Sequence, residues 1–146
     1  MTPEQQSAIV IEARRWLNTP YHHGAAVHGA GVDCLMLLCC VFNLAGVVPW
    51  TDPRPYPSDW MLHRNEERYL LGLEGHAKEL PAGTPLEPGD IATFRFGRTF
   101  SHAAIVTEWP NIIHAFLPAG IVTADRADAA AFVGRLGPLF RVEAST

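Results

Sequence analysis

The chain has few positive charges and no stretch in which they gather. Its 11 lysine and arginine residues stand against 15 aspartate and glutamate residues, so the formal net charge at pH 7 is −4. Domains that bind nucleic acids usually present a basic patch, because they must neutralise phosphates. The sequence therefore excludes nucleic acid as the expected partner.

Cysteine is also scarce, and a long hydrophobic run is missing. Of the three cysteines, Cys39 and Cys40 are adjacent, so the set offers no disulfide framework and is typical of a reducing compartment. The most apolar stretch, residues 35–48, is interrupted by Asn43 and Gly46 and is too short to span a bilayer. The first residues lack the basic and apolar regions of a secretory signal, so we expect synthesis in the cytoplasm and no membrane span.

What is present indicates a single globular domain over residues 1–146. Apolar residues make up 48% of the chain and charged residues 18%, which is typical of a protein with one packed core. Thr2 and Gln5 have the spacing of a capping box, and the apolar residues that follow recur at helical spacing, which predicts a helix over residues 3–17. A second helix is predicted from Cys34 to about residue 45, where a glycine follows.

The second half of the chain has the character of a β-sheet. Short segments rich in β-branched and aromatic residues, separated by turn signals, predict strands at residues 91–96, 101–106, 111–116, 120–124 and 138–142. Between the halves, residues 49–57 form a proline-rich stretch, after which Ser58 and Asp59 are placed to cap a third helix. This order predicts the α+β fold class, with N-terminal helices packed on a C-terminal antiparallel sheet.

Cys34 lies where a glycine-rich loop, residues 24–31, runs into the second predicted helix. Asp33 precedes it and is suited to cap that helix. A thiol in the first turn meets unpaired backbone N–H groups and the positive end of the helix dipole, both of which favour the thiolate. Cys34 is therefore a candidate nucleophile, whereas Cys39 and Cys40 lie off its face of the helix and are predicted to be core residues.

Two histidines lie on neighbouring predicted strands. If residues 108–110 form the turn between these strands, His102 lies opposite Phe116 and His114 lies opposite Ala104. The two imidazoles then become diagonal neighbours on one face, about 7–8 Å apart at the backbone and within side-chain reach. A slip of one residue in one strand would send its histidine to the other face. A thiol followed by two such histidines is the composition of a nucleophile, a base and an orienting group.

Five short segments matter for their order and their rough spacing along the chain. They are Thr19-Pro20-Tyr21, Gly31-Val32-Asp33-Cys34, Pro88-Gly89-Asp90-Ile91, Ser101-His102-Ala103-Ala104-Ile105-Val106 and Ile113-His114-Ala115. Together they resemble the NlpC-type, papain-like cell-wall peptidases, and specifically the small versions found among phage tail proteins. The resemblance implies a papain-like NlpC-type fold. It also matches residues 49–79 to the insertion typical of the tail-associated branch.

The resemblance implies a cysteine peptidase with Cys34 as nucleophile, His102 as base and His114 as the residue that orients His102. Tyr21 would lie beside the thiol with its hydroxyl turned into the site. The implied substrate is the peptide stem of bacterial peptidoglycan, and no cofactor or metal is implied. The implied partners are other phage tail or baseplate proteins. The implied location is a virion tail or tail-like particle that acts at the bacterial cell wall after synthesis in the host cytoplasm.

The residues taken alone leave other interpretations open. Tyr21 can be a half-buried aromatic, and His114 a hydrogen-bonded core histidine. A zinc site built from Cys34 and nearby histidines is disfavoured, because the sequence has no Cys-x-x-Cys pair and no His-Glu-x-x-His segment.

Two further functions also stay open. Leu35 and Met36 follow Cys34 where many relatives of the family carry small residues, and we expect their bulk to narrow the cleft. The main alternative is therefore a structural tail-tip or assembly subunit with the same fold and little or no catalytic activity. A third hypothesis is an amidase or transferase that uses the same thiol chemistry on another acyl group.

Overall fold

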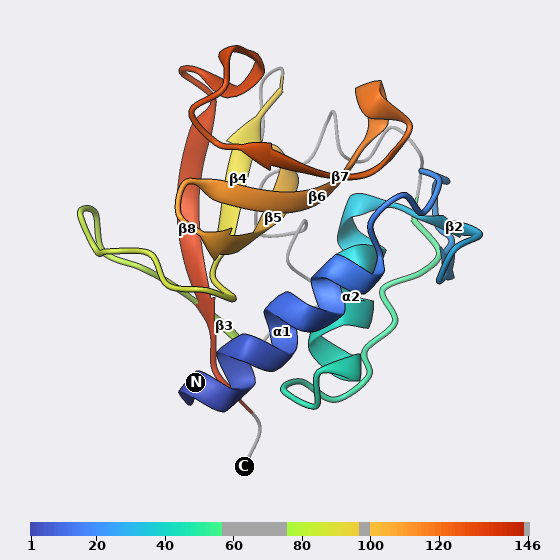
Figure 1. The fold of residues 1–146 in the computed structure, drawn as a ribbon, viewed down its shortest axis with the longest axis horizontal. Coiled ribbons are helices and arrows are strands. Elements are labelled where there is room, and N and C mark those ends of the chain that lie inside the picture. Colours follow the sequence, from blue (N-terminus) through green and yellow to red (C-terminus); the bar gives the residue numbers. More distant parts are fainter. Residues whose placement is uncertain (57–75, 97–99, 145–146) are drawn as a thin grey trace.

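A computed structural model describes residues 1–56, 76–96 and 100–144 of the chain. Helices α1 (Pro3–Arg15) and α2 (Cys34–Leu44) lie to one side of a six-stranded antiparallel sheet (Figure 1). This arrangement confirms the predicted α+β class. The third helix predicted after Ser58 lies outside the described residues.

Helix α1 begins with the predicted capping box. The Thr2 hydroxyl accepts a hydrogen bond from the Gln5 backbone N–H (3.1 Å), and the Gln5 side-chain oxygen accepts one from the Thr2 backbone N–H (2.8 Å). Two N–H groups that would otherwise lack partners are thereby satisfied. The helix ends at Arg15 with Trp16 as its cap, two residues earlier than the spacing predicts.

The strands follow the predicted order with somewhat different ends. The sheet has the order β3-β8-β4-β5-β6-β7. Its strands are β3 (Ala77–Glu79), β4 (Ile91–Arg95), β5 (Phe100–Glu108), β6 (Asn111–Phe116), β7 (Ile121–Arg126) and β8 (Leu136–Val142). Neither β3 nor the small hairpin of β1 (Ala26–Val27) and β2 (Gly31–Val32) was predicted, because such short strands carry too few residues for a periodic signal.

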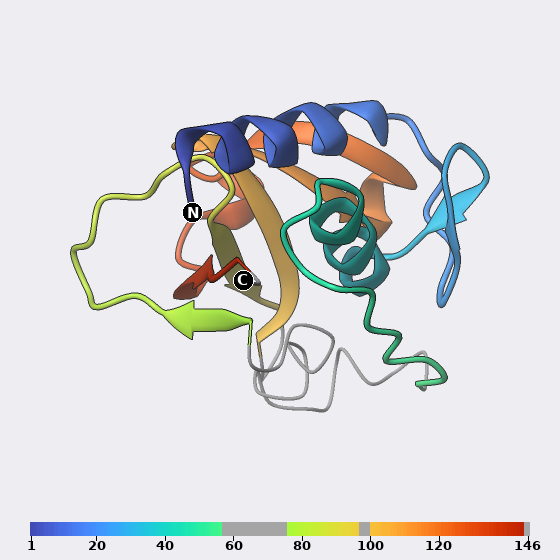
Figure 2. The ribbon, with the colours of Figure 1, turned by 90° about the horizontal axis from the view of Figure 1, so that it is seen from below.

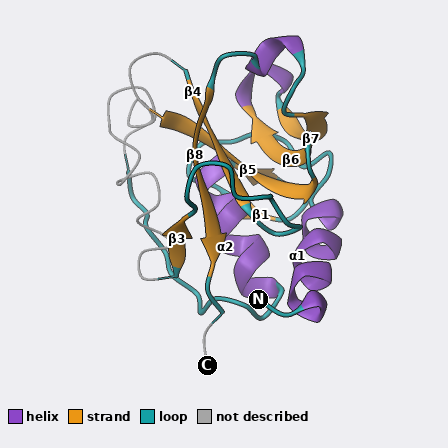
Figure 3. Cartoon of the chain, turned by 90° about the vertical axis from the view of Figure 1, so that its left-hand side faces the viewer, coloured by secondary structure: helices purple, strands orange, loops and turns teal. Residues whose placement is uncertain are grey.

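The last strand of the described chain is an inner strand of the sheet. Strand β8 pairs with β4 on one side and with β3 on the other, both antiparallel. Figure 3 shows β8 running beside β3 and β4. One end of the sheet is therefore built by pairings between segments that are far apart in the sequence.

The register between β5 and β6 is the predicted one. Ile105 pairs with Ile113 and Val106 with Ile112. Continued along both strands, this register places His114 opposite Ala104 and His102 opposite Phe116. Strand β5 runs on to Glu108, two residues beyond its predicted end, and an irregularity between Val106 and Glu108 takes up the extra residue next to the turn.

Alternation along the strands divides the apolar residues between two faces of the sheet. One core cluster joins both helices to alternate strand residues such as Ile105 and Ile113, and α2 is almost wholly buried within it. A second cluster on the other face includes Ala104, Ile112 and Phe132. In Figure 2, α1 (blue) lies along one side of the sheet and crosses α2 (cyan to teal, seen nearly end-on) steeply. Within the described ranges, no helix has the length and apolar content needed to cross a membrane.

A buried ion pair ties β8 to the start of β4. The side chain of Asp90 is completely buried, and Arg141 on β8 donates to both of its oxygens at 2.9 Å. The backbone N–H of Glu87 donates to the same carboxylate at 2.8 Å. These contacts give the Pro88-Gly89-Asp90-Ile91 segment a structural role, because they fix the entry into β4.

Removing one partner of this pair should destabilise the protein strongly. We expect Arg141→Leu to lower the free energy of unfolding by about 3–5 kcal/mol, because it leaves the Asp90 carboxylate buried without its cation. Urea unfolding followed by circular dichroism measures the effect. Arg126→Leu is the matched control, since Arg126 and its partner Asp128 are exposed, and it should change stability little. Equal effects of the two substitutions would contradict a structural role for Asp90.

Candidate active site

Cys34 is the first residue of α2, and Asp33 is the cap of that helix. The Asp33 Oδ1 atom accepts a hydrogen bond from the Met36 backbone N–H at 2.9 Å, which confirms the predicted capping role. The thiol therefore lies in the first turn, where the helix dipole stabilises negative charge. The Cys34 side chain is only 2% exposed.

The second oxygen of Asp33 fastens two other segments to the same point. Its Oδ2 atom accepts a hydrogen bond from the Gly24 backbone N–H at 2.7 Å, and a second one from the Tyr56 hydroxyl. The glycine-rich loop and the described start of the proline-rich segment thus converge on the beginning of α2. Arg54 adds a further contact, because its Nη1 atom donates to the Gly24 carbonyl at 3.1 Å.

The structure brings Tyr21 and Cys34 together. The Tyr21 hydroxyl lies close enough to the Cys34 thiol for the two groups to affect each other's ionisation. Burial, followed by the charges of Cys34 and Asp33, raises the pKa of Tyr21 well above its ordinary value, so the phenol stays protonated and can donate to a thiolate. The Tyr21 backbone is held as well, because its N–H donates to the Gly120 carbonyl at 2.8 Å.

The other side chains of α2 fill the core. Burial raises the pKa of Cys39 to about 12 and that of Cys40 to about 11, as expected of inert core thiols. Leu35 and Met36 are completely buried in the cluster between helices and sheet. The expectation that their bulk narrows a cleft is therefore wrong: the two side chains point into the core, where small residues would leave cavities.

His102 and His114 are in direct contact, as the strand register predicts. The His102 Nε2 atom lies 2.6 Å from the His114 Nδ1 atom. On its other side, the His114 Nε2 atom lies 2.7 Å from the Asp125 Oδ2 atom. We call this hydrogen-bonded series of His102, His114 and Asp125 the relay. It crosses three adjacent strands, β5, β6 and β7.

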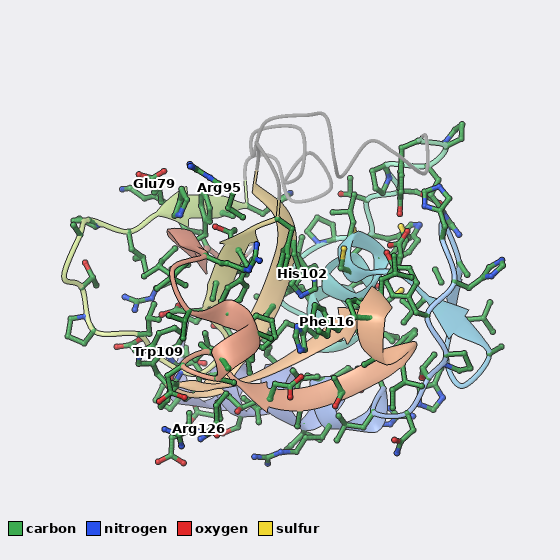
Figure 4. All side chains as sticks on the ribbon, turned by 90° about the horizontal axis from the view of Figure 1, so that it is seen from above. Glu79, Arg95, His102, Trp109, Phe116 and Arg126 are labelled. Atoms are coloured by element: carbon green, nitrogen blue, oxygen red, sulfur yellow. The ribbon has the colours of Figure 1, made fainter. Side chains whose placement is uncertain are left out.

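Phenylalanine rings surround the two imidazoles. Phe116 stacks on His114 with centroids 4.9 Å apart, and Phe96 approaches His102 edge-on at 6.0 Å. Phe132 lies against His114. Figure 4 shows His102 near the middle of the molecule, with Phe116 close to it.

This apolar setting keeps both rings neutral. Burial, with a smaller effect of His114, lowers the pKa of His102 well below its ordinary value. Burial also lowers the pKa of His114, although the hydrogen bond and the charge of Asp125 act in the opposite direction. A neutral imidazole is the form that can accept a proton.

The elements that carry the thiol and the imidazoles pack on one another. Helix α2, which begins with Cys34, contacts β5 and β6, which carry His102 and His114. The imidazoles themselves contact Phe94 and Phe132 of the second cluster, whereas Cys34 and the rest of α2 pack in the first cluster, on the other face of the sheet. The chain thus carries a thiol with a phenol donor at a helix start and a hydrogen-bonded pair of imidazoles on the sheet, which are the kinds of group that nucleophilic catalysis at an acyl carbon uses.

His28 of the glycine-rich loop and His23 just before it have separate partners. The His23 Nε2 atom lies 3.0 Å from the Tyr56 carbonyl oxygen, and the His28 Nε2 atom lies 2.5 Å from the Arg15 carbonyl oxygen. Within residues 1–56, 76–96 and 100–144, no three histidine, cysteine or acidic side chains gather in a way that could hold a metal ion.

Asp125 is the member of the relay that the sequence analysis missed. The predicted strand ended at residue 124, whereas β7 continues to Arg126 and pairs Asp125 with Ile112. Continued alternation from Thr123, which pairs with His114, would have placed Asp125 on the histidine face. The signal was therefore present, but the predicted strand stopped one residue before Asp125.

Comparison with known proteins gives a match in fold. No family model matches the sequence, and no curated protein matches it either. A Staphylococcus aureus protein described as similar to a lipoprotein of the NLP/P60 family matches 99% of this chain, with a TM-score of 0.71 and 19% identity. The chain spans 43% of the length of that structure.

Two shorter structures match along nearly their whole length. The NlpC/P60 domain of the peptidoglycan hydrolase SagA has a TM-score of 0.63 and 20% identity, over 97% of this chain and 98% of its own. An N-acetylmuramoyl-L-alanine amidase from Bacteroides uniformis has a TM-score of 0.61 and 12% identity, over 96% and 99%. The chain therefore has the papain-like fold of NlpC/P60 domains.

The two buried histidines should make stability depend on pH. In the unfolded chain both rings bind a proton below about pH 6.5, whereas in the folded protein their lowered pKa values delay binding. The free energy of unfolding should therefore fall as pH drops below about 6.5, by at most about 1.4 kcal/mol per pH unit for each histidine. Urea unfolding at a series of pH values measures this.

A double His102→Gln, His114→Gln variant should show a weaker dependence on pH in the same window. His22→Gln, which replaces an exposed histidine and keeps both buried rings, is the control. If the wild type keeps a constant stability from pH 7 to pH 5, the two rings are not held neutral by burial.

Proposed function

We propose that this chain is a cysteine hydrolase that cleaves the peptide stems of bacterial peptidoglycan. Cys34 is the nucleophile, His102 the base, His114 the residue that orients His102, and Tyr21 a donor beside the thiol. The observation that carries the proposal is the contact of His102 with His114 on the strands against which α2 packs, with Cys34 at the first position of that helix. The fold shared with the SagA domain, described as part of a peptidoglycan hydrolase, supports the choice of substrate.

The proposed reaction proceeds through an acyl-enzyme. The Cys34 proton passes to His102, and the thiolate attacks the carbonyl carbon of the stem amide, forming a C–S bond. His102 then donates its proton to the leaving amine as the C–N bond breaks. Water, deprotonated by His102, attacks the thioester carbonyl. The C–S bond breaks, the proton on His102 returns to the Cys34 sulfur, and the released carboxylic acid loses its own proton to solvent.

Negative charge develops on the carbonyl oxygen in the transition state, and hydrogen-bond donors must stabilise it. The Cys34 backbone N–H, at the start of α2, and the Tyr21 hydroxyl are the proposed donors. One such donor lowers the barrier by roughly 3 kcal/mol. Because burial keeps Tyr21 protonated, its hydroxyl is able to serve in this role over the working range of pH.

We further propose that the chain acts as a component of a phage tail or tail-like particle that helps to open the cell wall. The five sequence segments support this placement, together with the proline-rich segment that begins at Pro49. In the described part of that segment, Tyr56 and Arg54 fasten it beside the start of α2. A segment anchored there is suited to shape the approach to Cys34.

A structural tail-tip subunit is the second candidate. The observation in its favour is the burial of Cys34, whose side chain is 2% exposed. A subunit without turnover has no need of an accessible thiol. Activity and thiol reactivity therefore separate the two candidates.

Digestion of purified peptidoglycan tests the proposed activity. The wild type should release fragments with new amino and carboxyl termini, read by mass spectrometry, and Cys34→Ala should reduce the rate at least about 1,000-fold. Cys40→Ala is the matched control, since it removes a core thiol of the same helix, and it should keep activity in the fraction that is folded.

The products also distinguish the possible reactions. New termini within the stem indicate an endopeptidase, whereas stems released whole from the glycan indicate an amidase. Fragments produced equally by the wild type and Cys34→Ala, or by neither, would overturn the proposal, and the second result would favour the structural subunit.

Alkylation by iodoacetamide tests the activation of the thiol. At about pH 6, Cys34 should react well before Cys39 and Cys40, whose raised pKa values leave almost no thiolate. His102→Ala should remove this preference, because no imidazole is then present to take the proton from the Cys34 thiol. Peptide mapping gives the rate at each cysteine. Labelling of Cys34 at the rate of an ordinary thiol in the wild type would contradict an activated nucleophile.

A further inference from the structure

The carboxylate of Asp125 ends a hydrogen-bonded series that begins at His102. Its Oδ2 atom lies 2.7 Å from the His114 Nε2 atom, and the His114 Nδ1 atom lies 2.6 Å from the His102 Nε2 atom. His114 is completely buried, whereas the Asp125 side chain is 36% exposed. Asp125 lines a surface groove of about 590 Å³ together with Arg14, Glu108 and Arg126. The relay thus connects a buried imidazole pair to solvent.

The direction of both hydrogen bonds in the relay follows from the Asp125 carboxylate at its end. A carboxylate can only accept, so the hydrogen of His114 is on its Nε2 atom. A neutral imidazole carries one ring hydrogen, so the His114 Nδ1 atom is an acceptor. The His102 Nε2 atom must then donate to it, which leaves the His102 Nδ1 atom unprotonated and basic.

Within the described part of the chain, Asp125 is the one charged group with a hydrogen bond to the imidazole pair. Among the described residues, the rings packed against the two histidines belong to Phe94, Phe96, Phe116 and Phe132, which do not titrate. Of the other charged groups that line the groove, Arg126 is paired with Asp128 at 2.9 Å, and Arg14 and Glu108 come from α1 and β5. An interaction with a fixed charge is strong in such an apolar setting.

We propose that Asp125 is a positioning residue that acts through His114: it fixes the tautomer of His102 with Nδ1 free, and it stabilises the imidazolium that forms when His102 takes the proton of Cys34. The catalytic part of this inference rests on the proposed function, whereas the tautomer does not. The site then consists of a thiol, two imidazoles in series and a carboxylate. His114 both accepts from His102 and donates to Asp125, so a positive charge on His102 is met by a negative charge two hydrogen bonds away.

Nitrogen-15 NMR of the histidine side chains tests the tautomers directly, because the ring nitrogen shifts differ between N–H and unprotonated nitrogen. In the wild type at neutral pH, both His102 and His114 should carry their hydrogen on Nε2. In Asp125→Asn, the amide can donate as well as accept, so both rings should become mixtures of tautomers. The control Asp128→Asn removes an equal charge from the exposed ion pair with Arg126 and should leave the spectrum of both rings unchanged.

Reactivity gives the second readout. Asp125→Asn should lower both kcat and the alkylation rate of Cys34 at about pH 6 by roughly 10- to 100-fold, the range for outer partners of a functional imidazole, with little change in KM. Asp125→Glu, which keeps a carboxylate, should recover part of the loss. Asp128→Asn should behave like the wild type.

The experiments on Asp125 can fail independently of the experiments that test peptidoglycan hydrolysis. Wild-type rings with hydrogen on the Nδ1 atoms would overturn the inference even if Asp125→Asn failed to fold. It would also be overturned by unchanged tautomers in Asp125→Asn, or by unchanged kcat in a folded Asp125→Asn protein. If the wild type digests no peptidoglycan, the proposed function fails, and the NMR and alkylation results alone decide whether Asp125 controls His102.

Discussion

The register between β5 and β6 is the constraint on which the candidate site depends. Side chains alternate between the two faces of a strand, so a shift of one residue would turn His114 toward the helices and replace it with Ile113. The irregularity between Val106 and Glu108 lies beside the turn and takes up the extra residue there. The paired region further along the strands therefore keeps both histidines on one face. Their burial among phenylalanines is tolerated because each ring is hydrogen-bonded.

A second constraint fixes the thiol. Asp33 uses one oxygen to cap α2 and the other to hold the Gly24 backbone and the Tyr56 hydroxyl. One buried carboxylate thus sets the beginning of the helix, the course of the glycine-rich loop and the start of the proline-rich segment. Because Cys34 follows Asp33 directly, all three segments meet at the residue that precedes the thiol.

Most of the architecture could be predicted from local patterns. The capping box at Thr2, the cap at Asp33 and the contact of His102 with His114 follow from spacing and alternation alone. Asp125 was missed because strand ends depend on pairing with a neighbour, and pairing is not visible in one segment. The direction in which Leu35 and Met36 point was not predicted, for a similar reason. Which face of α2 meets the sheet is decided by the packing of the whole core.

The place of β8 within the sheet has a consequence for the order of folding. Strand β8 lies between β3 and β4, although both precede it by more than 40 residues in the chain. While a ribosome is still making residues 136–142, β4 has a free edge, and Asp90 has no arginine to neutralise it. The hydrophobic layer around the imidazoles, to which β4 contributes Phe94, therefore has its full strand pairing only when β8 is in place. The pairing of β4, and with it the neutralisation of Asp90, depends on a segment made more than 40 residues later.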